Sequence, residues 1–383
     1  MEPMQKKPKV SSESRASFPV MSKEELAAVL VPYADSDDFT AKLRKVLEEH
    51  GMAVVEGVLS ADECISFEES WRQELTKESA QPRKEVSDQG WWINAWLHAQ
   101  GETAWKARLH PRVRSCFDRM FGTSDLSCSM DTLKNFCVLE GQAATDNLEW
   151  LHVDQNTATG VTHPCYQGVL YIWPSEGAEK STTVVWPGSH RKDGVYGCLV
   201  EDPLARERSS LVDQAGVPFG HYIQLGDLRG TAAPDLQKEA LAGSRRVPVP
   251  RGALLLWDSC TTHQGWSGGP RLAVPVCWEP RGRVGEEARG RKLFMAAAGL
   301  PSTHSPSEGR FHPCVATRRG PSVRLRAPAV RPFGVLPPDA LPAAEWEALW
   351  TAWEGEQHVE EIASRWEPPA LERVLKPEIA ALL

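Results

Sequence analysis

The sequence predicts a mainly β core with flanking helices, because the middle of the chain and its two ends have different patterns. Between about residues 126 and 280, short apolar or alternating runs are separated by Gly, Pro, Asn and Asp, a pattern typical of sandwiches and barrels. These runs do not alternate with helical segments in the βαβ rhythm that indicates a parallel sheet. Helical patterns instead precede and follow them. We therefore expect an antiparallel β core with helical additions.

The N-terminal region is predicted to fold as helix, strand, helix. Ser22 stands at a helix-capping position before an acidic first turn, and Ser60 with Glu63 forms a capping box ahead of a second helix. Between these helices, the apolar run at residues 52–58 has the length and composition of a strand. This strand is expected to join the β core.

Five candidate strands fall within the β-rich region. They cover residues 129–139, 168–173, 182–186, 253–257 and 272–278. Pro275 lies inside the last of them, and because proline cannot donate a ladder hydrogen bond, that strand is expected at a sheet edge or with a bulge. Beyond residue 280 the chain is rich in Arg, Gly, Pro and Ser, and helices are predicted at residues 342–353 and 358–366.

Composition and charge exclude several classes of protein. Hydrophobic residues make up 41% and charged residues 25% of the chain, as in ordinary folded proteins. The net charge of −8 argues against a broad footprint on nucleic acid or anionic membrane. No apolar run approaches the roughly 18 residues that span a bilayer, and residues 1–20 lack a secretory signal. The nine cysteines include no CxxC pair, which suits a reducing compartment, so a cytoplasmic location is expected.

The triplet at residues 152–154 is the first motif with clear chemistry. In an extended strand, side chains two residues apart point the same way, so the imidazole of His152 and the carboxylate of Asp154 would meet at one point. Such a triplet is common by chance, and the similar one at residues 358–360 is interpreted as a solvated helix face. The interpretation of residues 152–154 therefore depends on what else the chain supplies.

A second stretch supplies a histidine and an arginine. A buried strand at residues 252–259 is followed by His263, and past a Ser-Gly-Gly-Pro turn Arg271 opens an alternating strand. An antiparallel hairpin would place His263 and Arg271 on adjacent strands, close enough for one small dicarboxylate to touch a metal and a guanidinium. Two imidazoles and one carboxylate on one face suit non-haem Fe(II) and leave three coordination positions open.

The sequence resembles the phytanoyl-CoA dioxygenase family of iron(II)/2-oxoglutarate-dependent oxygenases over about residues 48 to 280. The matching segments occur in the family's order, at residues 51–60, 152–154, 186–190 and 252–271. The resemblance implies a double-stranded β-helix, the cupin-like jelly roll. Together with the patterns along the chain, it predicts a flexible N-terminal tail (1–20), a helical N-terminal region with one strand joining the core (21–125), a jelly-roll catalytic core (126–280) and a loop-rich, helical C-terminal extension (281–383).

The resemblance also implies a role for particular residues. The iron would be bound by His152, Asp154 and His263, and 2-oxoglutarate would be contacted by Arg271, Trp173 and Lys134. Arginine suits the distal carboxylate because its planar fork binds carboxylates in a bidentate manner. No catalytic residue beyond the metal ligands is implied.

The arginine assignment has alternatives. The interval between His263 and Arg271 is shorter than the family's spacing, so either the hairpin is tight or Arg281 or Arg283 takes the role. All three arginines stay candidates from the sequence.

The function implied by the resemblance is oxidation of a small molecule, with Fe(II) as metal, 2-oxoglutarate and O2 as cosubstrates, and ascorbate as an aid to turnover. Succinate and CO2 would be released. Related halogenases carry a small residue at the position of Asp154, so hydroxylation or desaturation is predicted instead of halogenation.

Two alternatives stay open. One is a catalytically inactive cupin-like protein that binds metal and 2-oxoglutarate. The other is a nuclear oxygenase that acts on nucleic acid or protein, motivated by the basic segment Lys6, Lys7, Pro8 and Lys9 and opposed by the negative net charge. The sequence defines neither the substrate nor the oligomeric state, because pocket loops and surfaces determine both.

Overall fold

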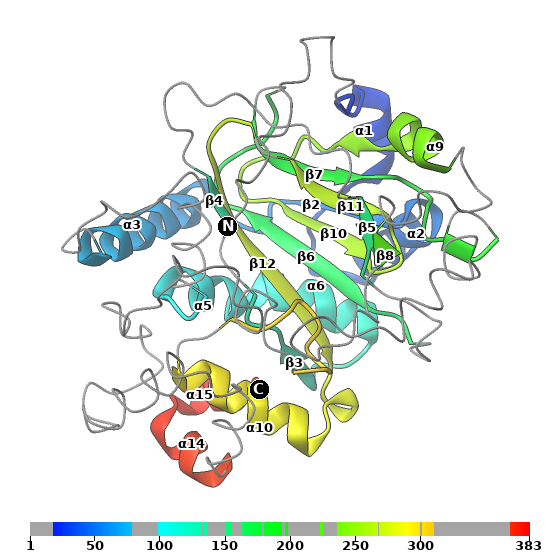
Figure 1. Cartoon of the computed structure of the whole chain (residues 1–383). Helices are drawn as coiled ribbons and strands as arrows, with labels where there is room; N and C mark the ends of the chain where they lie inside the picture. Colours follow the sequence, from blue (N-terminus) through cyan, green and yellow to red (C-terminus); the bar gives the residue numbers. More distant parts are fainter. Residues whose placement is uncertain are drawn as a thin grey trace, which may run out of the picture.

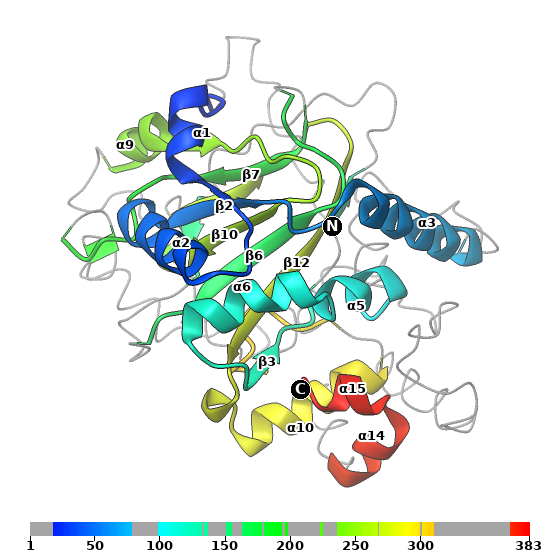
Figure 2. The same ribbon diagram turned by 180° about the vertical axis from the view of Figure 1, so that it is seen from behind.

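Two β-sheets flanked by helices make up the protein, as seen from opposite sides in Figure 1 and Figure 2. The structure is a computed structural model. It describes residues 18–78, 99–131, 134–136, 151–154, 163–177, 180–193, 196–197, 223–224, 236–266, 268–298, 301–309 and 368–383. None of the helices within these ranges has the length and apolar character of a membrane span.

The larger sheet has seven strands. In spatial order they are β1 (Leu30–Pro32), β2 (Met52–Glu56), β10 (Leu254–Asp258), β6 (Tyr166–Tyr171), β12 (Arg271–Pro280) and β3 (Leu126–Cys128), with β4 (Lys134–Phe136) also paired to β12. The pair β1 and β2 is parallel and is joined by a helix, whereas the other pairs are antiparallel. The sequence predicted β2 but not β1, which is too short to show periodicity.

The smaller sheet has five short strands, all paired antiparallel. In spatial order they are β8 (Ile223–Gln224), β5 (His152–Val153), β11 (His263–Trp266), β7 (Thr182–Val185) and β9 (Arg245–Arg246). Residues 18–20, at the end of the predicted tail, lie beside β9, where Arg246 donates its backbone N–H to Pro19. The rest of the tail falls outside the described residues.

The prediction that His263 and Arg271 lie on the two adjacent strands of one antiparallel hairpin is wrong. β11 pairs with β5 and β7 in the smaller sheet, whereas β12 pairs with β6, β3 and β4 in the larger one. The connecting segment is fastened to the start of β7, because the Ser181 hydroxyl donates to the Gly269 carbonyl and accepts from the Gly268 N–H. The chain therefore crosses from one sheet to the other after β11.

The expectation that Pro275 would mark an edge strand or a bulge is also corrected. β12 lies inside the larger sheet, and Pro275 stands in regular register opposite Val169 of β6. On its other side, β4 pairs with residues 271–273 and β3 with residues 278–280. Pro275 thus occupies the interval between two partner strands, where its missing N–H costs no ladder hydrogen bond.

Four of the five predicted core strands are confirmed, as β6, β7, β10 and β12. The run predicted at 129–139 is only partly a strand, since residues 129–131 lie outside β3, β4 covers 134–136, and residues 137–139 fall outside the described part of the chain. A long apolar run therefore predicted its strand better than a mixed one did.

The described helices are α1 (Lys23–Val29), α2 (Asp37–His50), α3 (Ala61–Glu78), α5 (Glu102–Arg108), α6 (Pro111–Phe121), α9 (Leu236–Gly243), α10 (Glu286–Ala298), α14 (Pro368–Val374) and α15 (Pro377–Ala380), with a 3-10 turn at Arg281–Arg283. Most of them pack against the outer face of the larger sheet or below its β3 end (Figure 2), whereas Leu236 and Ala240 of α9 pack with the smaller sheet. The predicted caps are confirmed, because Ser22 and Ser60 each exchange hydrogen bonds with the residue three positions on. The helices predicted at 342–353 and 358–366 lie outside the described residues.

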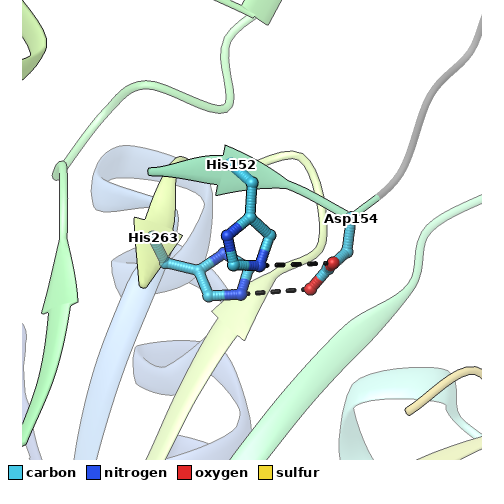
Figure 3. Close-up of side chains that lie close together, drawn as sticks. All are labelled: His152, Asp154 and His263. Carbon is cyan, nitrogen blue, oxygen red and sulfur yellow. Dashed lines mark ion pairs between the residues drawn. The ribbon is translucent and has the colours of Figure 1, made fainter. Parts of the chain in front are cut away.

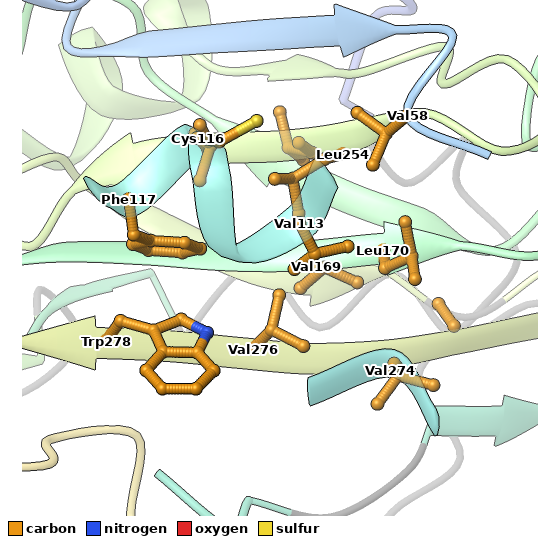
Figure 4. Close-up of a cluster of buried hydrophobic side chains, with 14 of the residues drawn as sticks. Val58, Val113, Cys116, Phe117, Val169, Leu170, Leu254, Val274, Val276 and Trp278 are labelled. Carbon is orange, nitrogen blue, oxygen red and sulfur yellow. The ribbon is translucent and has the colours of Figure 1, made fainter. Parts of the chain in front are cut away.

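The main apolar core lies between α6 and the larger sheet (Figure 4). Val113 and Phe117 of α6 pack over β6 and β12, where Val276 and Trp278 are fully buried. A second cluster includes Val153, Val184 and Trp266 of the smaller sheet. Because side chains alternate along a strand, this packing turns the neighbouring His152, Thr183 and His263 toward the larger sheet.

Candidate metal centre

The three predicted ligands converge between the two sheets (Figure 3). His152 of β5 and His263 of β11 are direct partners in the ladder, and their ring centroids lie 4.5 Å apart. Asp154 follows β5, where its backbone N–H donates to the Ser259 carbonyl after β10. Neighbouring strands therefore place the imidazoles, and a turn from the opposite sheet places the carboxylate.

The geometry fits a single metal ion. One ligand atom from each of His152, Asp154 and His263 lies within 4.8 Å of the others. Nε2 of His152 is 3.5 Å from Oδ1 of Asp154, and Nε2 of His263 is 3.0 Å from Oδ2. Two imidazoles and one carboxylate with open positions are the donor set of non-haem Fe(II) sites. The sequence thus predicted correctly that these side chains meet, and their binding of iron stays a prediction.

Asp154 is held in its charged form. Burial alone would raise the pKa of this carboxyl group, but the imidazoles of His304, His152 and His263 outweigh it and place the pKa well below the usual value. A metal ligand must be deprotonated, so this environment prepares the carboxylate for a cation.

His263 is oriented by its backbone surroundings. Its Nδ1 lies 2.9 Å from the Thr261 carbonyl, which can only accept, so Nδ1 carries the proton and Nε2 faces Asp154. The Trp257 ring packs against the imidazole with centroids 4.9 Å apart. Metal-binding histidines commonly donate their second ring N–H to such a carbonyl, which fixes the tautomer.

Gln167 is a site residue that the sequence reasoning missed. From β6 in the larger sheet, its amide donates to Oδ2 of Asp154 at 2.7 Å and lies 3.4 Å from the Ser259 hydroxyl. The side chain is buried, and it fixes the orientation of the carboxylate from the interior. A signal was present, since Gln167 is a polar residue in a strand whose following positions are apolar.

Arg271 lies between the sheets. Its guanidinium donates to the Tyr171 hydroxyl at 2.8 Å and to Oγ1 of Thr183 at 3.3 Å, and it stacks over the Tyr171 ring. Burial lowers the pKa of Arg271. In β7, Val185 pairs with His263, and Thr183 lies two residues from Val185. The contact between Arg271 and Thr183 is therefore roughly 7 Å along the strand from the position of His263. A small dicarboxylate can span such an interval.

The two alternative arginines lie elsewhere. Arg281 donates to Asp125 at 2.9 Å, and Arg283 donates to the Pro164 carbonyl at 2.6 Å. Both follow the far end of β12, roughly 30 Å along the strand from Arg271. Of these three candidates, the structure places only Arg271 between the sheets beside β7.

The other two predicted 2-oxoglutarate contacts receive less support. Trp173 is half-buried against the apolar core, and no contact among the described residues joins it to His152, Asp154 or His263. Tyr171, two residues earlier, contacts Arg271 instead. Lys134 belongs to β4 opposite Ala273, and its side chain falls outside the described residues. Both assignments stay predictions.

A further histidine approaches the centre from the C-terminal region. Nε2 of His304 is 3.7 Å from Oδ2 of Asp154, and its side chain is 28% exposed. No motif surrounds His304 in the sequence, so its place could not be found before the chain was folded.

The cluster between the two sheets has the donor set of two histidines and one carboxylate that is typical of non-haem iron sites. Comparison of the sequence identifies the family. The profile of the phytanoyl-CoA dioxygenase (PhyH) family matches residues 47–268, more than half of the chain. The chain belongs to this family, as its resemblance had implied.

Individual relatives are more distant. Ava biosynthesis cluster protein O from Aspergillus versicolor is 25% identical over 216 residues, which make up 54% of this chain and 64% of the relative, so the match spans less than two thirds of that protein. Among solved structures, the epimerase SnoN in complex with Fe3+, alpha-ketoglutarate and nogalamycin RO matches 63% of this chain and 84% of its own at 15% identity and a TM-score of 0.40. HygX from Streptomyces hygroscopicus with nickel and 2-oxoglutarate matches 62% and 85% at 16% identity and a TM-score of 0.39.

Proposed function

We propose that the protein is an iron(II)- and 2-oxoglutarate-dependent dioxygenase whose metal is bound by His152, Asp154 and His263. The observation that carries this proposal is the convergence of two imidazoles and one charged carboxylate in a buried space between the sheets. Membership of the phytanoyl-CoA dioxygenase family supports the same assignment. The donor set leaves positions for a chelating cosubstrate and for oxygen.

The two sheets are proposed to be the halves of a double-stranded β-helix. Along the chain from β5, the strands alternate between the sheets: β5 belongs to the smaller, β6 to the larger, β7 to β9 to the smaller, β10 to the larger, β11 to the smaller and β12 to the larger. Such alternation between facing sheets is what a jelly roll requires. The division of the chain into tail, helical region, core and extension stays a prediction.

The chain's own residues have separate parts in the proposed reaction. Arg271, buried beside Tyr171 and Thr183, would bind the distal carboxylate of 2-oxoglutarate, and Asp154 would stay deprotonated at neutral pH. Bound iron would supply the redox chemistry that couples oxidation of 2-oxoglutarate to oxidation of a substrate C–H bond, with release of succinate and CO2. The burial of the centre excludes water from the reacting groups.

A small-molecule substrate and a hydroxylation or desaturation are proposed. Asp154 occupies the carboxylate position, which leaves no vacant place for halide. The name of the Aspergillus relative refers to a biosynthetic cluster, which supports a small-molecule substrate. The cytoplasm stays the expected location and ascorbate an expected aid to turnover.

Anaerobic titration tests the proposal. Addition of Fe(II) and then 2-oxoglutarate to the metal-free protein is expected to produce a visible charge-transfer band, and admission of air with fractions of a metabolite extract is expected to release succinate. The Asp154→Asn variant is the control and should give neither signal. Absence of the band in the unmodified protein would refute the proposal, whereas a band without succinate across a broad screen would favour an inactive binding protein.

A further inference from the structure

The C-terminal region brings a side chain to the candidate metal centre. His304 lies beyond residues 47–268, the part of the chain that matches the family profile. Its Nε2 is 3.7 Å from Oδ2 of Asp154. The His304 side chain is 28% exposed, against 8% for Asp154, so the imidazole is in contact with solvent and the carboxylate is buried.

His304 is held in place by the segment that carries it, residues 301–309, which we call the strap. Ser302 exchanges two hydrogen bonds with the backbone of Met130, of 2.7 and 3.0 Å. Further along, the Ser307 N–H donates to the buried carboxylate of Glu279 at 2.8 Å. His304 lies between these anchors, so its approach to Asp154 is set by the backbone of the strap.

The strap is fastened again at its end. Arg291 of α10 donates to the carbonyls of Glu308 and Gly309 at 2.9 and 3.1 Å. Hydrogen bonds from a charged donor are stronger than neutral ones. The strap is therefore bound to the region after β3, to β12 and to α10, all of which belong to the larger sheet or pack beneath it.

Two residues outside the predicted ligand set, Gln167 and His304, approach the same carboxylate oxygen of Asp154, Oδ2. Gln167, buried in β6, donates to Oδ2 from the interior at 2.7 Å, whereas His304 faces the same oxygen from the more exposed side. Groups that hold one oxygen of a ligating carboxylate orient the other toward the metal and raise the affinity of the site.

His304 is not placed as a ligand itself. Among the described residues, the set whose ligand atoms lie within 4.8 Å of one another contains His152, Asp154 and His263 and does not include His304. An effect of His304 on a bound metal would therefore pass through Asp154.

We propose that His304 is a positioning residue of the metal centre, which together with Gln167 holds Oδ2 of Asp154 and thereby tightens metal binding. This inference rests on the proposed function, because it requires His152, Asp154 and His263 to bind a metal. Partners of ligating residues commonly change metal affinity by about 10- to 100-fold. Since 3.7 Å exceeds a hydrogen-bond distance, the lower end, about tenfold, is expected.

Titration of the metal-free full chain with Mn(II), followed by the electron paramagnetic resonance signal of free Mn(II), measures the effect. His304→Ala is expected to raise the Kd for Mn(II) about tenfold, and His304→Gln, which retains an N–H donor, is expected to recover most of the loss. His50→Ala is a matched control, because His50 is 32% exposed and lies 3.9 Å from the Glu49 carboxylate on the surface. Its Kd should equal that of the unmodified protein, and thermal unfolding of each metal-free variant verifies the fold.

A second variant tests the role of the strap. Ser302→Ala removes the hydroxyl that accepts from the Met130 N–H, so it should loosen the strap and raise the Kd by a smaller factor. In the His304→Ala background the same change should have no further effect, because residues that act as one unit are not additive.

The outcomes separate the inference from the proposed function. Tight Mn(II) binding by both the unmodified protein and His304→Ala would overturn the role of His304 and leave the metal centre standing. A His304→Ala variant with unchanged Mn(II) affinity but weaker 2-oxoglutarate binding would also overturn it, because the imidazole would then act on the cosubstrate at the open coordination positions of the metal and not on Asp154. Failure of the unmodified protein to bind Mn(II) would refute the metal centre itself.

Discussion

The larger and smaller sheets differ in the length of their strands and in what lies on them. β12 and β6 of the larger sheet run for ten and six residues and pack apolar side chains against α6. No described strand of the smaller sheet exceeds four residues, yet this sheet carries His152 and His263. Long ladders with apolar faces supply stability, whereas the short strands position the imidazoles of the site. The larger sheet therefore carries most of the apolar packing, and the smaller sheet carries the two histidines of the candidate metal centre.

Polar contacts from the larger sheet join it to the smaller sheet at the site. Gln167 of β6 donates to Asp154, and Arg271 of β12 donates to Thr183 of β7. If the division between the sheets is real, substitutions in the centre should affect activity more than folding, and substitutions in the larger sheet the reverse.

The largest effect is expected at the centre itself. Asp154→Asn should lower iron-dependent succinate release at least about a thousandfold, because a lost ligand charge costs several kcal/mol of metal and transition-state stabilisation. The variant should still unfold cooperatively, since an asparagine oxygen can accept from Gln167. Succinate assays and circular dichroism on the same preparation measure both. Loss of cooperative unfolding would show that the centre also holds the fold.

The next largest effect tests the other half of the comparison. Leu254, fully buried in β10, pairs with Val55 of β2 and Leu170 of β6 and lies on the side of α6 (Figure 4). Leu254→Ala should reduce the free energy of unfolding by about 2–5 kcal/mol through lost burial and a residual cavity. Denaturant unfolding measures this cost, and Mn(II) titration without denaturant should give an unchanged Kd. A parallel loss of metal affinity would show that the sheets are not independent.

Arg271 bridges the two regions and should show an intermediate effect. Arg271→Ala should raise the 2-oxoglutarate concentration for half-maximal succinate release by about 10- to 100-fold, as expected for a charged hydrogen bond of 1.5–3 kcal/mol. The maximal rate should change little if the contact is equal in ground and transition states. Arg281→Ala, which removes a contact to Asp125, is the control. An equal effect in that variant would move the assignment to Arg281.

The parts of the fold that the sequence predicted are those with strong local signals. β6, β10 and β12 are apolar runs long enough to recognise, whereas β1, β5, β8 and β9 have two or three residues and no periodicity. The sheet to which β11 and β12 belong could not be predicted, because local patterns do not encode which strands pair across a turn. Pro275 was misplaced for the same reason, since its tolerance depends on where β3 and β4 end.

The same distinction holds for the candidate site. His152 and Asp154 were found because two-residue spacing in a strand places side chains together, and His263 because it follows a buried strand. Gln167 and His304 reach Asp154 only through tertiary structure, from β6 and from the strap. A resemblance that ends near residue 280 gave no reason to consider His304.

The two regions also differ in how they accommodate a buried charged side chain. Asp154 is surrounded by imidazoles, whereas Lys292 of α10 is fully buried and donates to the Ser127 hydroxyl in β3 of the larger sheet. Burial lowers the pKa of Lys292 from 10.5 to about 8. The buried charge of Lys292, next to the larger sheet, therefore opposes folding at neutral pH.

The smallest expected effect follows from this lysine. Between pH 8 and 10.5 the unfolded chain binds more protons at Lys292 than the folded chain, so this residue makes the free energy of unfolding rise with pH across that window. Lys292→Met should stabilise the protein at pH 7 by about 1–3 kcal/mol, and its advantage should shrink as the pH approaches 10.5. Buried thiols such as Cys128, whose pKa burial raises, change stability in the opposite direction, so the difference between variant and unmodified protein at each pH is the quantity to measure. Denaturant unfolding across this range provides it, and a difference independent of pH would mean that Lys292 has the same pKa in the folded and unfolded chain, so that its contact with Ser127 fully compensates for its burial.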